Sequence, residues 1–150
     1  MTFKIALVGC GGMGRRHAHG YIELRKYFDT VEMTAVCDVY HDVAATVASE
    51  IGEATGSTPD IYTDFGEMLA QADLDGVAIV TSTPMHHIFA IKAMNTGLHV
   101  ITEKPMGLTL KACRQMREVS QSTGKVMAVA ENYRRDPMNR LTRALIQAGA

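Results

Sequence analysis

The sequence lacks any apolar run long enough to cross a membrane. Hydrophobic residues make up 47% of its 150 positions, but they fall in short runs, whereas a spanning helix needs roughly 18 consecutive apolar residues. The amino terminus shows neither the basic region nor the small-residue cleavage site of a secretory signal. We therefore expect no membrane contact and a cytoplasmic location.

An excess of charge of either sign is also missing. Fifteen Lys and Arg residues stand against sixteen Asp and Glu residues, which gives a net charge of -1 at pH 7. Proteins that bind nucleic acid need a surplus of positive charge to neutralise phosphates. The composition therefore argues against a nucleic-acid partner.

Cysteine is scarce. The chain has three, Cys10, Cys37 and Cys113, at wide spacing. An odd, scattered set does not form a disulfide framework, and it falls short of the clustered ligands of a zinc site. We expect buried thiols in a reducing compartment, and no metal.

What the chain does have is a regular alternation of short apolar runs and longer amphipathic segments. We predict strands at residues 3–8, 31–37, 76–81, 98–103 and 125–131, with a weaker one at 60–62. We predict helices at residues 14–27, 42–50, 65–71, 85–95, 110–122 and 137–148. Apolar strands that alternate with helices predict an α/β fold, a Rossmann-type doubly wound parallel sheet flanked by helices.

Local signals mark several helix ends. Asp64 and Thr109 stand where a side chain can cap the first turn of a following helix. Gly97 and Gly124 stand just past helix ends, where a left-handed residue is wanted. Residues 53–59, EATGSTP, are the most loop-like stretch.

The first strand runs into a glycine cluster, in the sequence KIALVGCGGMGRRHAHGY of residues 4–21. The pattern is G-x-G-x-x-G between a strand and an amphipathic helix, the context of a dinucleotide site. The first glycine allows the tight turn, the second lets backbone approach a pyrophosphate, and the last lets the helix pack near the strand. An ordinary tight turn is the alternative. The residues expected to bind the cofactor here are Gly9, Gly11, Gly12, Met13 and Gly14.

An acid ends the second strand, as such a site requires. Asp38 can accept both ribose hydroxyls of an adenosine, and its charge repels a 2′-phosphate. Residues 39–41 contain no Arg or Lys to receive that phosphate. We therefore expect NAD, with NADP less favoured. The alternative role for Asp38 is to cap the helix before Val43, and one carboxylate can serve both purposes.

Basic residues follow the glycines, and the sequence leaves their roles open. Arg15 and Arg16 either reach the pyrophosphate or are simply solvated. His17 either packs under the loop or touches the cofactor.

A second group of motifs lies in TSTPMHHIFAIKAMNTGLHVITEKP, residues 81–105. Together with the glycine loop and Asp38, the chain from Lys4 onward resembles the glucose-fructose oxidoreductase / inositol dehydrogenase / rhizopine-catabolism family. Residues 130–137, AENYRRDP, resemble the segment that leads out of that family's nucleotide domain. The other motifs that carry the resemblance are Thr83-Pro84 with a histidine soon after, Gly97-Leu98-His99-Val100 and Glu103-Lys104-Pro105.

The resemblance implies nicotinamide-dependent hydride transfer to or from a sugar, a cyclitol or a related alcohol. It makes Lys104 the catalytic lysine, contacting both nicotinamide and substrate. It also places Pro105 at a tight turn, often with a cis peptide bond, that aims Lys104. The alternative for Lys104 is an ordinary surface lysine before a proline. A lysine just past a strand's carboxyl end can stabilise a developing alkoxide.

The resemblance implies further contacts. A histidine near the start of the helix at 85–95 lies by the nicotinamide or caps the helix, and its register favours His86 over His87. The remaining cofactor contacts are Thr81, Ser82, Pro84 and Glu103. The remaining substrate contacts are Asn132 and Arg134.

Family members continue into a second domain that usually supplies a histidine, and often an aspartate, for substrate binding and proton transfer. We expect residues 1–124 to form the dinucleotide-binding domain and 125–150 to form the last strand and a linker helix, with the C-terminal substrate domain missing. The chain alone is then expected to be inactive, and apolar residues of the last helix favour a homo-oligomer. The alternative is a stand-alone dinucleotide-binding module that serves as a sensor or scaffold.

Overall fold

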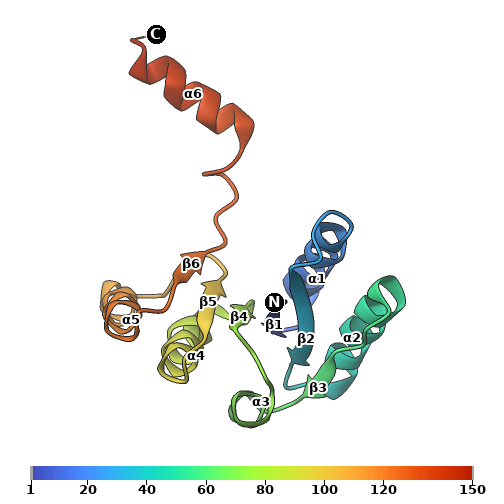
Figure 1. Ribbon diagram of the computed structural model, residues 1–150. Coiled ribbons are helices and arrows are strands. Elements are labelled where there is room, and N and C mark those ends of the chain that lie inside the picture. Colours follow the sequence, from blue (N-terminus) through green and yellow to red (C-terminus); the bar gives the residue numbers. More distant parts are fainter. Residues whose placement is uncertain (1, 150) are drawn as a thin grey trace.

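The computed structural model describes residues 2–149, and its centre is a six-stranded parallel sheet (Figure 1). The strands follow one another in space as β3-β2-β1-β4-β5-β6, and every neighbouring pair is parallel. The predicted Rossmann-type sheet is confirmed. The strands are β1 (Phe3–Val8), β2 (Val31–Cys37), β3 (Asp60–Tyr62), β4 (Gly76–Ile79), β5 (His99–Thr102) and β6 (Met127–Val129).

Helices cover both faces of this sheet. One apolar core joins one face to the helices that follow β1 and β2, through residues such as Ala18 and Val47. A second core joins the other face to three further helices, through residues such as Met68, Met94 and Met116. The helices are α1 (Gly12–Arg25), α2 (His41–Thr55), α3 (Phe65–Gln71), α4 (Thr83–Asn95), α5 (Leu110–Thr123) and α6 (Pro137–Gln147).

The predicted helix ends are confirmed where a side chain or a glycine marks them. Asp64 accepts a hydrogen bond from the backbone N–H of Glu67 at 2.8 Å. Thr109 accepts one from the backbone N–H of Ala112 at 3.2 Å. Gly97 and Gly124 have φ of 94° and 68°, which only glycine adopts without strain.

Helix α2 is longer than predicted. It runs to Thr55, so it includes residues 53–55, which we had expected in a loop. The Thr55 hydroxyl donates to the carbonyl of Ile51 at 2.7 Å, inside the helix. The helix stops at Gly56, whose φ is 76°. Gly56, rather than the loop-like composition that begins at residue 53, sets this boundary.

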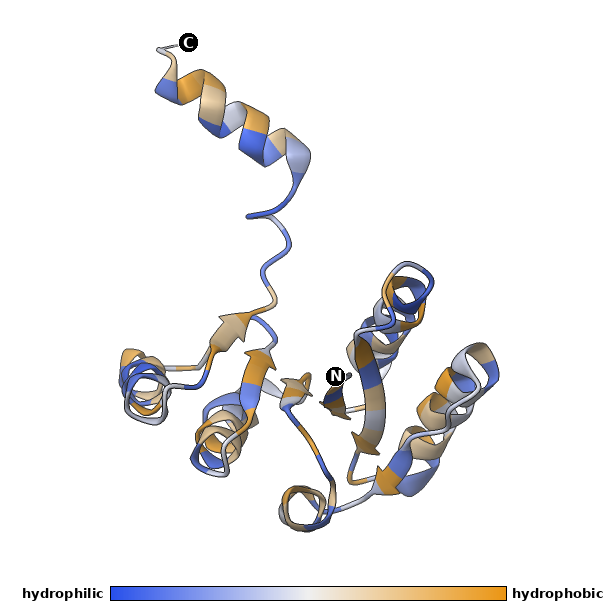
Figure 2. Ribbon diagram, viewed as in Figure 1, coloured by the Kyte–Doolittle hydropathy of each residue, from blue (hydrophilic) through white to orange (hydrophobic). Residues whose placement is uncertain are grey.

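Helix α6 stands away from the sheet. In Figures 1 and 2 it lies apart from the sheet, beyond the coil that follows β6. None of its residues is buried, and Met138, Leu141, Leu145 and Ile146 are all at least half exposed. None of the helices within residues 2–149 is long and apolar enough to cross a membrane.

The expected domain boundary at residue 124 separates β6 from the sheet that it completes. Val100, Ile101 and Thr102 of β5 pair with β6. The sheet therefore continues to Val129, and only the segment beyond it leaves the layered body. Residues 1 and 150, the outer limits of the two expected domains, lie outside the described residues.

Candidate functional site

The strand order reverses between β1 and β4, and we call the region beyond the carboxyl ends of these strands the crevice. The chain leaves β1 toward β2 on one side, and leaves β4 toward β5 on the other. Open parallel sheets bind ligands at such a point, beyond the carboxyl ends of their strands. Gly9 turns the chain here with φ of 92°, and a Cβ on it would lie 2.7 Å from the carbonyl oxygen of Val80. The turns after β1 and β4 are thus packed against each other.

The glycines of the loop divide into two kinds. Gly14 is buried, and a Cβ on it would overlap the carbonyl oxygen of Gly9. The protein's own packing therefore requires Gly9 and Gly14. A Cβ on Gly11 or Gly12 would meet no protein atom within 4 Å. Nothing in the protein excludes side chains there, so glycine at these two positions fits a ligand that comes close to the backbone.

The start of α1 matches such a ligand. Gly11 is its N-cap residue and supplies no side-chain hydrogen bond, and the first turn carries no acidic residue. The first N–H groups of the helix consequently face outward without a side-chain acceptor. Free amides and the positive end of the helix dipole suit a phosphate. The residues present fit the pyrophosphate of a dinucleotide.

Asp38 is joined to this loop. One of its carboxylate oxygens accepts from the backbone N–H of Cys10 at 2.8 Å, and the other accepts from that of Tyr40 at 3.0 Å. The alternative role as the cap of α2 is wrong, because the N-cap residue is Tyr40 and no side chain caps that helix. Each oxygen keeps a further lone pair for a ribose hydroxyl.

The Glu103-Lys104-Pro105 turn follows β5 on the other side of the crevice. The backbone N–H of Glu103 donates to Ile79 of β4 at 2.9 Å. The Lys104–Pro105 peptide bond is cis, as the family resemblance implied. Lys104 is exposed, and its ammonium forms no ion pair within residues 2–149. A free ammonium at this place is available to a bound molecule.

Both carboxylate oxygens of Glu103 have hydrogen-bond partners. One oxygen lies 3.0 Å from Nε2 of His17, and the other accepts from the backbone N–H of Lys104 at 2.9 Å. Burial alone raises the pKa of Glu103, but the hydrogen bonds from His17 and Lys104, with their positive charge nearby, bring that pKa below its usual value. Glu103 is therefore a carboxylate at neutral pH.

Lys104 faces an open cleft of about 940 Å³ between α1 and the segment after β6. Of the residues predicted to contact substrate, Asn132 lines it and Arg134 does not, whereas the neighbouring Arg135 does. A sequence pattern cannot separate these adjacent arginines, since no helix or strand period fixes which way each one points. The charged residues in the lining are Arg16, Lys104, Arg135, Glu103, Glu131 and Asp136.

The prediction that His86 contacts the cofactor is not supported. The residue is 1% exposed. Its Nδ1 lies 3.0 Å from the carbonyl oxygen of Pro105, and its Nε2 lies 3.0 Å from that of Thr81. A ring enclosed between two carbonyls has no surface to offer a nicotinamide, so its role here is to join two turns.

The other basic residues of α1 are also placed. Arg15 forms an ion pair with Glu50 of α2, and Nε2 of His19 lies 3.3 Å from the same carboxylate. Arg15 is thus engaged between helices, while Arg16 faces the cleft. His17 contacts Glu103, which lies 86 positions further along the chain, and no local sequence pattern predicts this contact.

Thr81, Ser82 and Pro84 lie where α4 begins, beside the packed turns of the crevice. Ser82 is the N-cap residue of α4, and no side chain caps that helix. Thr81 is half-buried, and Ser82 and Pro84 are exposed. They are open to a molecule bound along the crevice.

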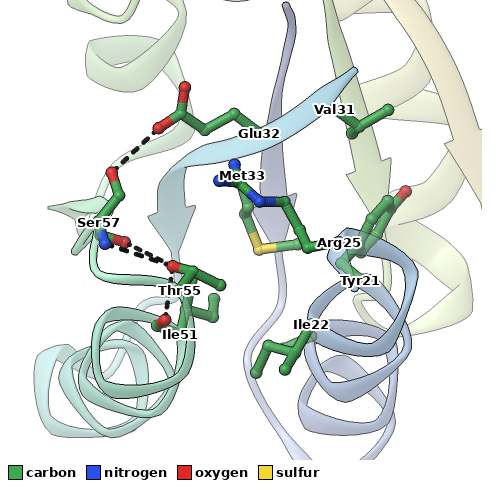
Figure 3. A pocket seen from close by; sticks show the side chains of 10 residues that line it. Tyr21, Ile22, Arg25, Val31, Glu32, Met33, Ile51, Thr55 and Ser57 are labelled. Atoms are coloured by element: carbon green, nitrogen blue, oxygen red, sulfur yellow. Dashed lines mark hydrogen bonds between the residues drawn. The ribbon is translucent and has the colours of Figure 1, made fainter. Parts of the chain in front are cut away.

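A smaller pocket between α1, α2 and β2 is not a ligand site (Figure 3). Its volume is about 20 Å³, which is room for a single water. Val31, Glu32 and Met33 place it at the amino end of β2, opposite the crevice. Within residues 2–149 no group of three or more His, Cys, Asp or Glu side chains could hold a metal ion.

Comparison with known proteins agrees with this geometry. Residues 3–131 match the model of an oxidoreductase family with an NAD-binding Rossmann fold. The chain belongs to this family. It is the NAD-binding domain of the glucose-fructose oxidoreductase / inositol dehydrogenase / rhizopine-catabolism group that the sequence resembles, so the predicted membership is confirmed.

Two of the similar proteins are named as dehydrogenases, and others are named as glycosyl hydrolase family 109 proteins. The chain is 34% identical over 146 residues to a 4-carboxy-2-hydroxymuconate-6-semialdehyde dehydrogenase of Sphingobium sp., covering 97% of this chain and 44% of the relative. It is 32% identical over 148 residues to a D-apiose dehydrogenase of Paraburkholderia graminis, covering 99% of this chain and 37% of the relative. The chain thus spans about two-fifths of the length of these relatives.

Solved structures show the same arrangement. The scyllo-inositol dehydrogenase of Lactobacillus casei, solved with bound NAD(H) and scyllo-inositol, superposes with a TM-score of 0.86 at 27% identity. The myo-inositol 2-dehydrogenase of Lactobacillus plantarum gives the same TM-score and identity. Both alignments cover 99% of this chain and 42% of the solved one.

Proposed function

We propose that this domain binds NAD and serves an oxidoreductase that moves hydride between nicotinamide and an alcohol carbon of a sugar, a cyclitol or a related compound. The observation that carries the proposal is the position of Lys104. Its free ammonium stands past the carboxyl end of β5, beside an open cleft, while the glycine loop stands past the end of β1 in the same crevice.

Different residues would bind different parts of NAD. The backbone of Gly11, Gly12 and Met13 at the start of α1 would hold the pyrophosphate, with Gly9 and Gly14 giving the loop its shape. The carboxylate of Asp38 would take the adenosine ribose. Further along the crevice, the cofactor would meet Thr81, Ser82, Pro84, Glu103 and Lys104.

NAD supplies the hydride acceptor, and the chain's own residues handle the substrate oxygen. The Lys104 ammonium would donate a hydrogen bond to that oxygen and stabilise the negative charge that it carries once its hydroxyl proton has passed to a base, before hydride leaves the carbon. Asn132, which lines the cleft, would orient the substrate. Arg135 also lines the cleft, and we propose it in place of Arg134 as the charged contact.

We propose NAD rather than NADP. Asp38 keeps lone pairs free at the end of β2, and a 2′-phosphate would meet its negative charge without a Lys or Arg at positions 39–41. Titration of the chain with both cofactors tests this. Tighter binding of NADP than of NAD would refute it.

The substrate class follows from the relatives. A D-apiose dehydrogenase and two inositol dehydrogenases, enzymes named for a sugar and for cyclitols, are among them. Because the chain spans about two-fifths of their length, we propose that this domain supplies the cofactor site and Lys104, and that further protein completes the substrate site. We also propose a cytoplasmic homo-oligomer, supported by the three unpaired cysteines and by the exposed apolar face of α6.

The test measures binding and turnover separately. NADH fluorescence should report binding to the chain, and a panel of sugars and polyols should then be assayed with NAD on the chain and on any longer protein that contains it. Lys104→Met should abolish turnover and leave NADH binding in place. Turnover equal to wild type would contradict the role of Lys104. Binding with no turnover under any condition would instead favour a stand-alone nucleotide-binding module.

A further inference from the structure

Both neighbours of Lys104 in the chain are held by a histidine, and each histidine comes from a different helix. His17 of α1 lies 3.0 Å from the side chain of Glu103. His86 of α4 lies 3.0 Å from the backbone carbonyl of Pro105. The lysine between these two residues makes no ion pair of its own within the described chain.

The contact between His17 and Glu103 crosses the crevice. It joins the helix that begins at the glycine loop to the turn after β5, with side chains that are only 18% and 12% exposed. Glu103 is a carboxylate at neutral pH, so Nε2 of His17 must carry a proton and donate it. The second oxygen of the same carboxylate takes the backbone N–H of Lys104. Helix α1 therefore reaches the Lys104 backbone through one side chain.

The contact made by His86 fixes the other side of the lysine. Its ring is fully enclosed and lies between the carbonyl of Thr81, after β4, and that of Pro105, after β5. A neutral imidazole carries one N–H, so the ring donates to one of these carbonyls at a time, and the contact that concerns Lys104 is the one from Nδ1 to Pro105. The ring thus packs between the turn that opens α4 and the turn that carries Lys104.

We propose that His17 and His86 are positioning residues, which together set where Lys104 stands relative to the glycine loop. The functional part of this inference rests on the proposed role of Lys104. A lysine side chain is long and flexible, so the backbone beneath it must be fixed if the ammonium is to meet one substrate oxygen. The two histidines supply that fixing from both faces of the sheet, since α1 packs on one face and α4 on the other.

The first test measures hydrogen exchange at the backbone N–H of Lys104 in the chain without cofactor or substrate. His17→Leu should raise the exchange rate about tenfold, as expected when a hydrogen bond of ordinary net strength is lost. His17→Gln can place a donor near the position of Nε2 and should stay within about threefold of wild type.

His19→Leu is the matched control for this test. His19 lies on the same helix and also contacts a glutamate, Glu50, but far from the Lys104 turn. It should leave exchange at Lys104 unchanged, with thermal unfolding measured for every variant. If His17→Leu exchanges no faster at Lys104 than His19→Leu, helix α1 does not hold the turn and the proposal fails.

The second test uses the wild-type chain, so it does not depend on whether a variant folds. Long-range correlation between ring protons and nitrogens in the wild-type chain reports which nitrogens are protonated. We expect a proton on Nε2 of His17 and on Nδ1 of His86. An unprotonated Nδ1 in His86 would mean that Pro105 is not held by the ring, and an unprotonated Nε2 in His17 would break the other contact. Either result overturns the corresponding half of the proposal.

These readouts are independent of the proposed reaction. Should Lys104→Met leave turnover intact, the proposed function fails while the exchange and nitrogen data still stand. Should the exchange data fail, NAD binding and the role of Lys104 are untouched. Where a substrate is found, His17→Leu should lower kcat more than it raises the KM for NAD, and His17→Gln should restore part of the loss.

Discussion

The carboxylate of Asp38 accepts a hydrogen bond from the backbone N–H of Cys10 at 2.8 Å, although 28 positions separate the two residues. The acid at the end of β2 is thus part of the glycine loop before any nucleotide arrives. Its second oxygen holds the N–H of Tyr40, where the chain enters α2. One side chain therefore shapes the loop and remains free to accept ribose hydroxyls.

Asp38→Ala should weaken both the fold and NADH binding. The N–H of Cys10, a buried residue, loses its acceptor, which costs about 1–3 kcal/mol of unfolding free energy. Asp38→Asn keeps one oxygen, which can accept from Cys10 but not also from Tyr40, and should recover part of the stability. Urea unfolding followed by NADH titration measures both effects. Equal stability of the alanine and asparagine variants would contradict the structural role.

Two alanine substitutions in the glycine loop should behave in opposite ways. Gly14→Ala places a Cβ against the carbonyl of Gly9 and should destabilise the chain severely. Gly12→Ala meets no protein atom and removes a poor helix former from α1, so its melting temperature should equal or exceed that of wild type.

The affinity of Gly12→Ala for NADH should nevertheless fall about tenfold or more, because the new methyl group stands where we propose the pyrophosphate approaches. Melting curves and fluorescence titration on the same samples separate the two effects. Undiminished affinity in Gly12→Ala would show that the ligand does not approach this backbone.

The thiols of the first two strands should resist alkylation. Burial, followed by the negative charge of Asp38, raises the pKa of Cys10 to about 12, and the same two causes raise that of Cys37 to about 11. Iodoacetamide at mildly alkaline pH should therefore modify the half-buried Cys113 first. Peptide mass mapping over time gives the order in which the three thiols are modified. In urea, which unfolds the chain, the differences in rate between them should disappear. Early modification of Cys10 in the folded chain would be contrary to this arrangement.

Stability should depend on pH through Glu103. Its pKa is lower in the folded chain than the ordinary 4.5, so the unfolded chain binds its proton first as the pH falls. The carboxylate therefore stabilises the fold above about pH 4.5, and that contribution is lost as the pH drops through the folded pKa. Glu103→Gln removes it. The difference in unfolding free energy between wild type and this variant should be larger at about pH 7 than at about pH 3.5. A difference that does not change with pH would show that the Glu103 carboxylate does not stabilise the fold.

Much of the fold follows from local patterns in the sequence. Each strand lies within a predicted stretch. Strands of a parallel sheet are buried on both faces, so they appear in the sequence as short, continuous apolar runs. Asp64 and Gly124 mark helix ends through hydrogen bonding and backbone freedom that depend on the residue itself. The glycine loop and Asp38 are recognisable because their spacing reflects the shape of the nucleotide.

The rest of the site is made of contacts that no local pattern encodes. The pairing of His17 with Glu103 depends on α1 passing beside the end of β5, which is a matter of sheet order. The burial of His86 depends on which face of α4 meets the turns, and the apolar residues on that helix do not define one narrow stripe. Residue type suggested a ligand contact, whereas packing gives the ring two carbonyls instead.

The sheet ends on both sides in strands of only three residues, β3 and β6. Such a short edge strand exposes few unpaired backbone donors and acceptors, so a β-strand of a neighbouring molecule can form few hydrogen bonds with it. Built this way, the layered body is protected against polymerising edge to edge at high concentration, even though every one of its strands runs in the same direction.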